Sequence, residues 1–181
     1  MSTQTIKNNE FGYLGNPSVK RDGVQSQFTK AEVIEYQKCM RDPAYFARKH
    51  LKVISLDDGL VPFDLYPYQE EMFDHFKQNR FTIVLACRQS GKSISSVGYI
   101  LWYAVFHPEK TIAILANKGA TAREMLSRIT LMLENLPFYL QPGCKALNKG
   151  SIEFSNNSKI IAAATSGSSI RGLSINLLFL D

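Results

Sequence analysis

Hydrophobic and polar positions recur at helical spacing through the first part of the chain. Thr29 and Glu32 have the spacing of a capping box ahead of an apolar face, which predicts a helix that begins at Thr29. Asp42 followed by Pro43 predicts a second helix start, with the aspartate as cap and proline in the first helical position. A short linker that contains Asp57-Asp58-Gly59 follows, and then a third helix that ends near residue 79.

Short apolar runs appear from residue 81 onward. Three of them, at 81–86, 111–116 and 177–180, consist mainly of strand-forming residues and predict strands buried on both faces. The segments 92–106 and 119–136 carry apolar residues at helical spacing. This order of strand, helix, strand, helix and strand predicts an α/β fold with a mainly parallel sheet.

Two turn sequences interrupt this order before the last strand. Asn148-Lys149-Gly150 and Asn156-Asn157 predict turns within a small antiparallel excursion. At the other end of the chain, residues 1–27 are rich in Asn, Ser, Gln, Gly and Lys, which is typical of a poorly ordered segment. We therefore expect a flexible arm over 1–27, a helical region over 28–60 and the α/β domain over 61–181.

Composition excludes several classes of protein. The hydrophobic content of 45% fits a globular protein, and no apolar run is long enough to cross a bilayer. The three cysteines are too few and too widely spaced for a disulfide framework, which suits a reducing compartment. Of the net charge of +5, most lies in residues 91–181, which carry nine basic and five acidic side chains. That excess slightly favours a polyanionic partner such as a nucleotide or nucleic acid.

The segment Ala86-Cys87-Arg88-Gln89-Ser90-Gly91-Lys92-Ser93 is the strongest candidate for chemistry. It matches the phosphate-binding pattern G-x-x-x-x-G-K-[ST] except that Ala86 replaces the first glycine. A buried strand is predicted before it and a helix after it, so that backbone N–H groups and the helix N-terminus would surround a phosphate. Lys92 would reach the β- and γ-phosphates, and the Ser93 hydroxyl would bind Mg²⁺. The alternative is a surface turn that happens to carry a lysine.

A second part of this site is predicted at the end of the chain. Leu177-Leu178-Phe179-Leu180 precedes Asp181, which places a carboxylate at the carboxyl end of a predicted strand, where ligands bind in open α/β sheets. Asp181 is therefore the second candidate ligand for Mg²⁺, the alternative being an aspartate that merely begins a loop. Many ATPases of this type carry a catalytic glutamate directly after this aspartate, and the sequence contains no such residue.

Taken together, these motifs resemble the ATPase domain of the large terminase subunits of tailed phages, closest to the T-even type. The resemblance covers about residues 40–181. It implies a three-layer P-loop NTPase fold of the RecA-like (ASCE) kind, truncated after the strand that leads to Asp181 (the Walker B strand). A phosphate loop without its first glycine is typical of this family. The segments that carry the resemblance are Tyr66-Pro67-Tyr68-Gln69, Cys87 to Ser93, Ile114 to Gly119, Leu136-Pro137 to Gly143, Asn148 to Glu153, Ile170-Arg171-Gly172 and Leu177 to Asp181.

The resemblance also implies roles for individual residues. Tyr68 and Gln69 match the element that recognises adenine, because glutamine both donates to and accepts from the base edge and tyrosine stacks on the ring. The alternative for Tyr68 is a place on the core face of its helix. Arg88 matches the arginine of the family's loop, which stabilises transition-state charge, and its alternative is a solvated charge that steers phosphate. Arg171 is implied to sense the γ-phosphate, in its own subunit or across a subunit boundary, or else to be an ordinary surface arginine.

On this resemblance, the protein would be the N-terminal part of an ATP-driven motor that moves double-stranded DNA into a viral capsid. ATP and Mg²⁺ would be its cofactors. The portal protein, the small terminase subunit and further copies of the chain in a ring would be its partners, in the cytoplasm of the host cell and away from membranes. The family's C-terminal nuclease is not in this sequence. A superfamily 2 helicase-like ATPase and a non-catalytic piece that only binds partners remain alternatives. His50, His75 and His107 have no ligand spacing and are expected at the surface or as caps.

Overall fold

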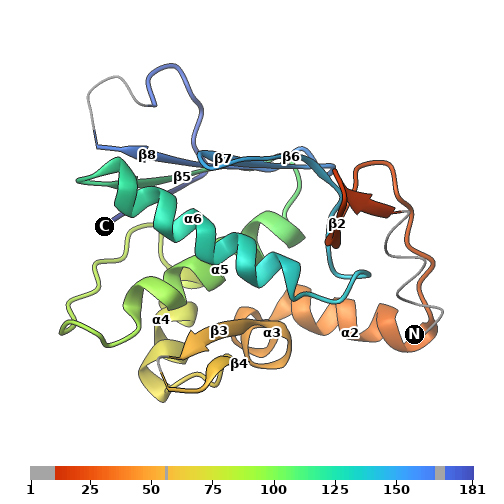
Figure 1. The fold of residues 1–181 in the computed structure, drawn as a ribbon. Coiled ribbons are helices and arrows are strands. Elements are labelled where there is room, and N and C mark those ends of the chain that lie inside the picture. Colours follow the sequence, from red (N-terminus) through yellow and green to blue (C-terminus); the bar gives the residue numbers. More distant parts are fainter. Residues whose placement is uncertain (1–10, 56, 166–169) are drawn as a thin grey trace.

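The computed structural model describes residues 11–55, 57–165 and 170–181. Its described segments stack in three layers: a five-stranded sheet, two long helices beneath the sheet, and three shorter helices beneath those (Figure 1). None of the helices in the described segments is long and apolar enough to span a membrane.

The sheet is mixed rather than mainly parallel, with strand order β6-β7-β8-β5-β9. β5 pairs in parallel with both β8 and β9, whereas β6 with β7 and β7 with β8 are antiparallel. The predicted turns at Asn148-Lys149-Gly150 and Asn156-Asn157 are confirmed as the β6–β7 and β7–β8 connections. The strands are β5 (Thr111–Ala116), β6 (Cys144–Leu147), β7 (Ser151–Phe154), β8 (Lys159–Ala164) and β9 (Leu177–Leu180).

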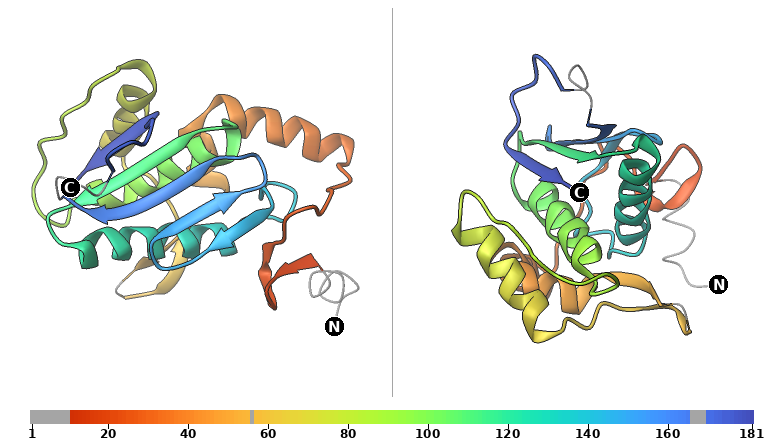
Figure 2. Two further views of the ribbon diagram at one scale, coloured as in Figure 1. Left: turned by 90° about the horizontal axis from the view of Figure 1, so that it is seen from above. Right: turned by 90° about the vertical axis from the view of Figure 1, so that its left-hand side faces the viewer.

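The two helices of the middle layer form where the spacing of apolar residues predicts them. They are α5 (Lys92–Phe106) and α6 (Gly119–Glu134). Residues such as Leu101, Leu126 and Ile129 are almost fully buried, and α6 packs on β5 and β8. In Figures 1 and 2, the helices of the described segments all lie on one face of the sheet. The predicted P-loop fold implied helices on both faces, and the described segments do not show that arrangement.

Three helices form the outer helical layer, and the helix starts and caps predicted at Thr29 and Asp42 are confirmed. Its helices are α2 (Lys30–Arg41), α3 (Pro43–His50) and α4 (Pro67–Gln78). Thr29 and Glu32 form the capping box of α2, and the Asp42 side chain accepts a hydrogen bond from the Tyr45 N–H at the start of α3. The predicted linker between α3 and α4 instead contains a hairpin, β3 (Lys52–Ser55) with β4 (Gly59–Pro62), which turns at the Asp-Gly pair.

Part of the predicted flexible arm is folded. β1 (Gly12–Tyr13) and β2 (Asn16–Lys20) form a hairpin, and Val19 and Lys20 are buried. Residues 1–10 lie outside the described segments.

The prediction of a buried strand over Phe81–Ala86 is wrong. This segment pairs with no strand among the described residues, and all of its residues except Val84 are exposed: Phe81 is 82% exposed, Ile83 96% and Leu85 100%. β9 is a strand as predicted but is not buried on both faces, since Leu178 and Leu180 are largely exposed.

Candidate functional site

The candidate phosphate loop leads directly into the first turn of α5. Gly91 caps α5 in a left-handed conformation, with φ of +77°, and Gln89 is also left-handed, with φ of 61°. Two left-handed residues so close together turn the chain sharply into the helix. The unpaired backbone N–H groups of the first helical turn of α5 therefore lie at this loop, where a helix N-terminus favours an anion.

Lys92 is folded back over the loop. Its Nζ donates to the carbonyl oxygen of Cys87 at 3.4 Å, and the Ser90 hydroxyl donates to the same carbonyl at 3.0 Å. The ion pairs found among the described residues do not include Lys92. The ammonium group thus contacts a neutral carbonyl and no carboxylate among the described residues.

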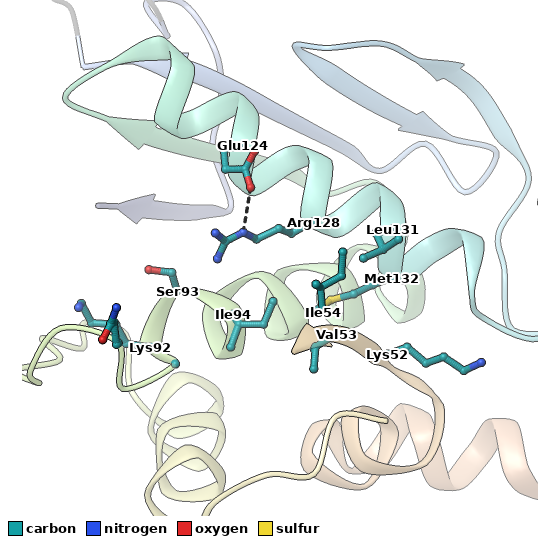
Figure 3. A pocket seen from close by; sticks show the side chains of 12 residues that line it. Lys52, Val53, Ile54, Lys92, Ser93, Ile94, Glu124, Arg128, Leu131 and Met132 are labelled. Atoms are coloured by element: carbon teal, nitrogen blue, oxygen red, sulfur yellow. Dashed lines mark hydrogen bonds and ion pairs between the residues drawn. The ribbon is translucent and has the colours of Figure 1, made fainter. Parts of the chain in front are cut away.

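A pocket with a volume of about 610 Å³ opens beside this loop. Gln89, Gly91, Lys92 and Ser93 line one end of it, and Figure 3 shows Arg128 extending from α6 toward the end of α5 that carries Ser93. Sequence reasoning missed the other walls, which come from β3 and α6. Those walls consist of Lys52, Val53, Ile54, Glu124, Arg128, Leu131 and Met132.

Arg128 and Glu124 form an ion pair across one turn of α6, with 3.3 Å between Nε and Oε1. Their i, i+4 spacing is visible in the sequence. No local pattern places that pair opposite the phosphate loop, because the contact between α5 and α6 is tertiary.

A second pocket, of about 290 Å³, also borders the loop. Tyr68, Gln69, Gln89, Ser90 and Gly91 all line it, so the structure brings the predicted adenine element and the phosphate loop together. The Tyr68 hydroxyl donates to the carbonyl of Ser90 in a short hydrogen bond. Tyr68 is 41% exposed, which excludes the alternative of a place on the core face of its helix.

Gln69 is only 2% exposed, and its side-chain oxygen accepts the Tyr66 N–H at 2.9 Å. The side chain therefore closes the first turn of α4 while its amide nitrogen lies toward Gly91. A buried amide that is fixed at its oxygen end presents its N–H₂ group in one orientation, which is how a site reads the edge of a planar ligand.

Asp181 follows β9 directly, and its backbone N–H donates to the carbonyl of Leu115 at 2.9 Å. In Figures 1 and 2 the C-terminus lies at the same end of the molecule as the loop that leads into α5. Asp181 lines neither of the two pockets beside the loop, and it is exposed. Ser93 and Asp181 would supply a hydroxyl and a carboxylate oxygen, the donor atoms that Mg²⁺ prefers, so the donor set fits that ion. The shared magnesium site remains a prediction.

The two predicted arginines lie apart from the walls of these pockets. Arg88 is exposed on the loop, and Arg171 is exposed between β8 and β9, next to residues 166–169, which lie outside the described segments. Neither lines the pockets described above. Their predicted roles at the γ-phosphate therefore remain predictions.

Comparison with known proteins agrees with this architecture. Residues 83–181, more than half of the chain, match the family described as terminase large subunit, T4likevirus-type, N-terminal. The fold is similar to that of the HK97 bacteriophage large terminase in its crystal structure, with a TM-score of 0.64 and 19% sequence identity. That similarity covers 78% of this chain and 30% of the HK97 protein, so the chain corresponds to less than a third of its length.

Proposed function

The chain belongs to the family of N-terminal regions of T4-like terminase large subunits, and from this premise we propose that it binds ATP with Mg²⁺ at the loop before α5. The observation that carries the proposal is the position of Gly91. Gly91 lines both pockets, as Gln89 does; Lys92 and Ser93 line the larger of the two, and Tyr68 and Gln69 line the smaller. A nucleotide has the same division into a charged phosphate end and a flat base.

We assign the two ends of the nucleotide as follows. The triphosphate lies at the N-terminus of α5, where Lys92 leaves the Cys87 carbonyl and contacts the β- and γ-phosphates. The adenine lies against Tyr68, and the amide of Gln69 contacts the edge of the base. Ser93 and Asp181 would hold the Mg²⁺, which neutralises phosphate charge when it is bound. Arg88 turns toward the γ-phosphate and stabilises the charge that develops there during hydrolysis.

For the complete protein, the family leads us to propose an ATP-driven motor for double-stranded DNA. Its partners would be the portal protein, the small terminase subunit and further copies of itself in a ring, in the cytoplasm of the host cell. Arg171 would act at the γ-phosphate, within one subunit or across a subunit boundary.

Titration with a fluorescent ATP analogue tests the nucleotide site. We expect saturable, Mg²⁺-dependent binding to the wild-type chain, and loss of most of it in Lys92→Ala. Lys145→Ala is the matched control, since Lys145 is an exposed lysine that donates to Asn157 at 2.7 Å, on the turn between β7 and β8. Equal binding by wild type and Lys92→Ala would exclude the loop as the phosphate site. Loss of binding in both variants would indicate non-specific attraction to basic side chains.

A second candidate function is association with other chains without catalysis. It is favoured by the exposed apolar side chains of residues 81–86 and of β9, which an isolated globular domain seldom presents to water. ATP binding that is abolished by Lys92→Ala separates the first function from the second.

A further inference from the structure

Three side chains with metal-binding atoms meet between α2 and α3, far along the chain from the phosphate loop. Glu35 and Cys39 lie one turn apart on α2, and His50 is the last residue of α3. One ligand atom from each lies within 4.8 Å of the other two. The Nε2 of His50 is 2.8 Å from Oε1 of Glu35, and Sγ of Cys39 is 3.8 Å from the same oxygen.

The spacing of these atoms is close to that around a small tetrahedral ion. Zinc binds sulfur at about 2.3 Å and nitrogen or oxygen at about 2.0–2.2 Å, so its ligand atoms lie about 3–4 Å from one another. Small side-chain shifts would bring the three atoms to those distances. Only side-chain torsions need to change, because both helices are already in place.

The surroundings hold this arrangement rigid. A single residue, Asp42, separates α2 from α3, and its side chain caps the second helix. The carbonyl oxygen of Cys39 accepts a hydrogen bond from Nε1 of the buried Trp102 at 2.8 Å, which ties this turn of α2 to α5. The Tyr45 hydroxyl donates to the Glu35 carboxylate, 3.1 Å from each oxygen, and so orients it. Tyr45 would thus orient Glu35 in the way that residues hydrogen-bonded to a metal ligand commonly do.

Charge and access also suit a divalent cation. Cys39 is fully buried, while the side chains of His50 and Glu35 are 9% and 20% exposed. The exposed parts of His50 and Glu35 give the ion a way in, and water would be its fourth ligand. A carboxylate, a thiolate and a neutral imidazole around one M²⁺ ion sum to zero charge, which favours such a group in a partly buried site.

We propose that Glu35, Cys39 and His50 bind one Zn²⁺ ion, which fastens α2 to α3. The sulfur and nitrogen donors select zinc over the Mg²⁺ that the nucleotide site would take, because hard cations prefer oxygen ligands. The ion binds the cysteine as thiolate, and the thiol proton leaves to solvent. His50 was expected at the surface because no nearby cysteine accompanies it in sequence. The fold brings Cys39 beside it from the preceding helix.

Cobalt is the most direct probe, because Co²⁺ replaces Zn²⁺ and reports its own ligands. Titration of the reduced 181-residue chain with Co²⁺ should give a thiolate-to-cobalt absorption band in the near ultraviolet and the visible bands of a tetrahedral ion, saturating at one equivalent. Added Zn²⁺ should abolish the bands, and a large excess of Mg²⁺ should not. Zn²⁺ should also raise the melting temperature, since it binds only the folded chain.

Variants identify the ligands. Cys39→Ser and His50→Gln should each lose the charge-transfer band or weaken cobalt binding strongly, and Tyr45→Phe should weaken it by about tenfold because the outer partner of Glu35 is removed. Cys87→Ser and Cys144→Ala should keep the band, so that the remaining thiol is identified even if Cys39→Ser fails to fold. His75→Gln is the matched histidine control, since His75 lies beside Glu71 with no cysteine. Absence of the band in the wild-type chain, or its loss in Cys87→Ser or Cys144→Ala, would overturn the proposal.

Discussion

A β-carbon on Gly91 would lie 2.5 Å from the side-chain nitrogen of Gln69. These two residues belong to different helices, with Gln69 in the first turn of α4 and Gly91 at the cap of α5. Gly91 lines both pockets beside the loop, and Gln69 lines the smaller of them. The glycine thus serves two needs: it adopts a positive φ, and it leaves room for the amide that closes the neighbouring helix turn.

Gly91→Ala should therefore be more harmful than an alanine at a glycine that only needs a positive φ. The left-handed conformation costs an alanine about 1–2 kcal/mol, and the contact with Gln69 adds strain, so we expect both a lower stability in urea and weaker nucleotide binding. Gly23→Ala is the matched control, because Gly23 has φ of +78° and open space around its β-carbon position.

A second substitution separates the two causes at Gly91. In a Gly91→Ala chain that also carries Gln69→Ala, the clash is removed, and the costs that remain are the positive φ and the loss of the Gln69 hydrogen bond to the Tyr66 N–H. We expect this double variant to be less destabilised than the sum of the two single variants. A strictly additive result would show that the contact between these two residues does not limit the loop.

Self-association is the next prediction, and it rests on the segment before the loop. Ile83 and Leu85 are 96% and 100% exposed, and apolar side chains in an extended, unpaired segment promote association. Ile83→Lys combined with Leu85→Lys should shift the chain toward monomer in sedimentation velocity across a concentration series, and should leave the melting temperature unchanged. Leu14→Lys, at a leucine that is 87% exposed elsewhere, should change neither. A marked fall in melting temperature in the double variant would instead show that this segment is packed in solution.

The same segment shows where prediction from sequence stops. Phe81–Ala86 and Thr111–Ala116 are similar apolar runs, and both predict strands. Only the second forms one, because β8 and β9 pair with its two edges. A strand requires a neighbour, and the neighbour is a property of the whole sheet that a local pattern does not contain. Helices satisfy their own backbone hydrogen bonds, which is why α2 to α6 were predicted within a few residues.

The candidate site, too, was predicted where local sequence patterns determine it and missed where long-range contacts do. The loop before α5, the cap at Gly91 and the pair Tyr68-Gln69 are local patterns, and the structure brings them together. The pocket walls from β3 and α6 were missed for two reasons. The segment that forms the β3–β4 hairpin was predicted to be a linker, and the sequence of α6 does not indicate which element it packs against. Long-range contacts also explain why part of the N-terminal arm is folded, since its buried residues pack against segments more than a hundred positions away.

The N-terminal hairpin provides a further prediction, through Gln141. This side chain is 2% exposed; its oxygen accepts the Lys20 N–H at 2.9 Å and its nitrogen donates to the Ser18 carbonyl at 2.9 Å. Gln141→Ala leaves these backbone groups without partners, at a cost of about 1–3 kcal/mol for each group that stays buried. We expect lower stability in urea and faster tryptic cleavage after Lys20.

Gln78→Ala is the control for that experiment, because Gln78 is exposed at the end of α4. Its effect on the free energy of unfolding should stay within about 0.5 kcal/mol, as for most surface substitutions. If Gln141→Ala proves equally neutral, the hairpin is not held to the domain through this side chain.

The last prediction concerns pH and His107, the residue that caps the C-terminal end of α5. Its ring stacks on Tyr103, with 4.5 Å between ring centroids, and its Nδ1 donates to the Tyr103 carbonyl at 3.2 Å. Burial lowers the pKa of His107 below its usual value of 6.5, and the positive charges of Lys110 and Lys77 lower it further, while the hydrogen bond to Tyr103 partly opposes them. The folded chain therefore favours the neutral ring.

Because the folded pKa is depressed, the unfolded chain binds the proton first as the pH falls. The contribution of the neutral ring to stability is complete above about pH 6.5, the usual histidine value, and is lost as the pH falls below it toward the folded pKa. The free energy of unfolding, measured in urea at pH 7.5 and at pH 5.5, should thus fall more in the wild-type chain than in His107→Gln. His75→Gln, at an exposed histidine on α4, should retain the wild-type fall. Equal falls in wild type and His107→Gln would mean that His107 is as easily protonated in the folded chain as in the unfolded one.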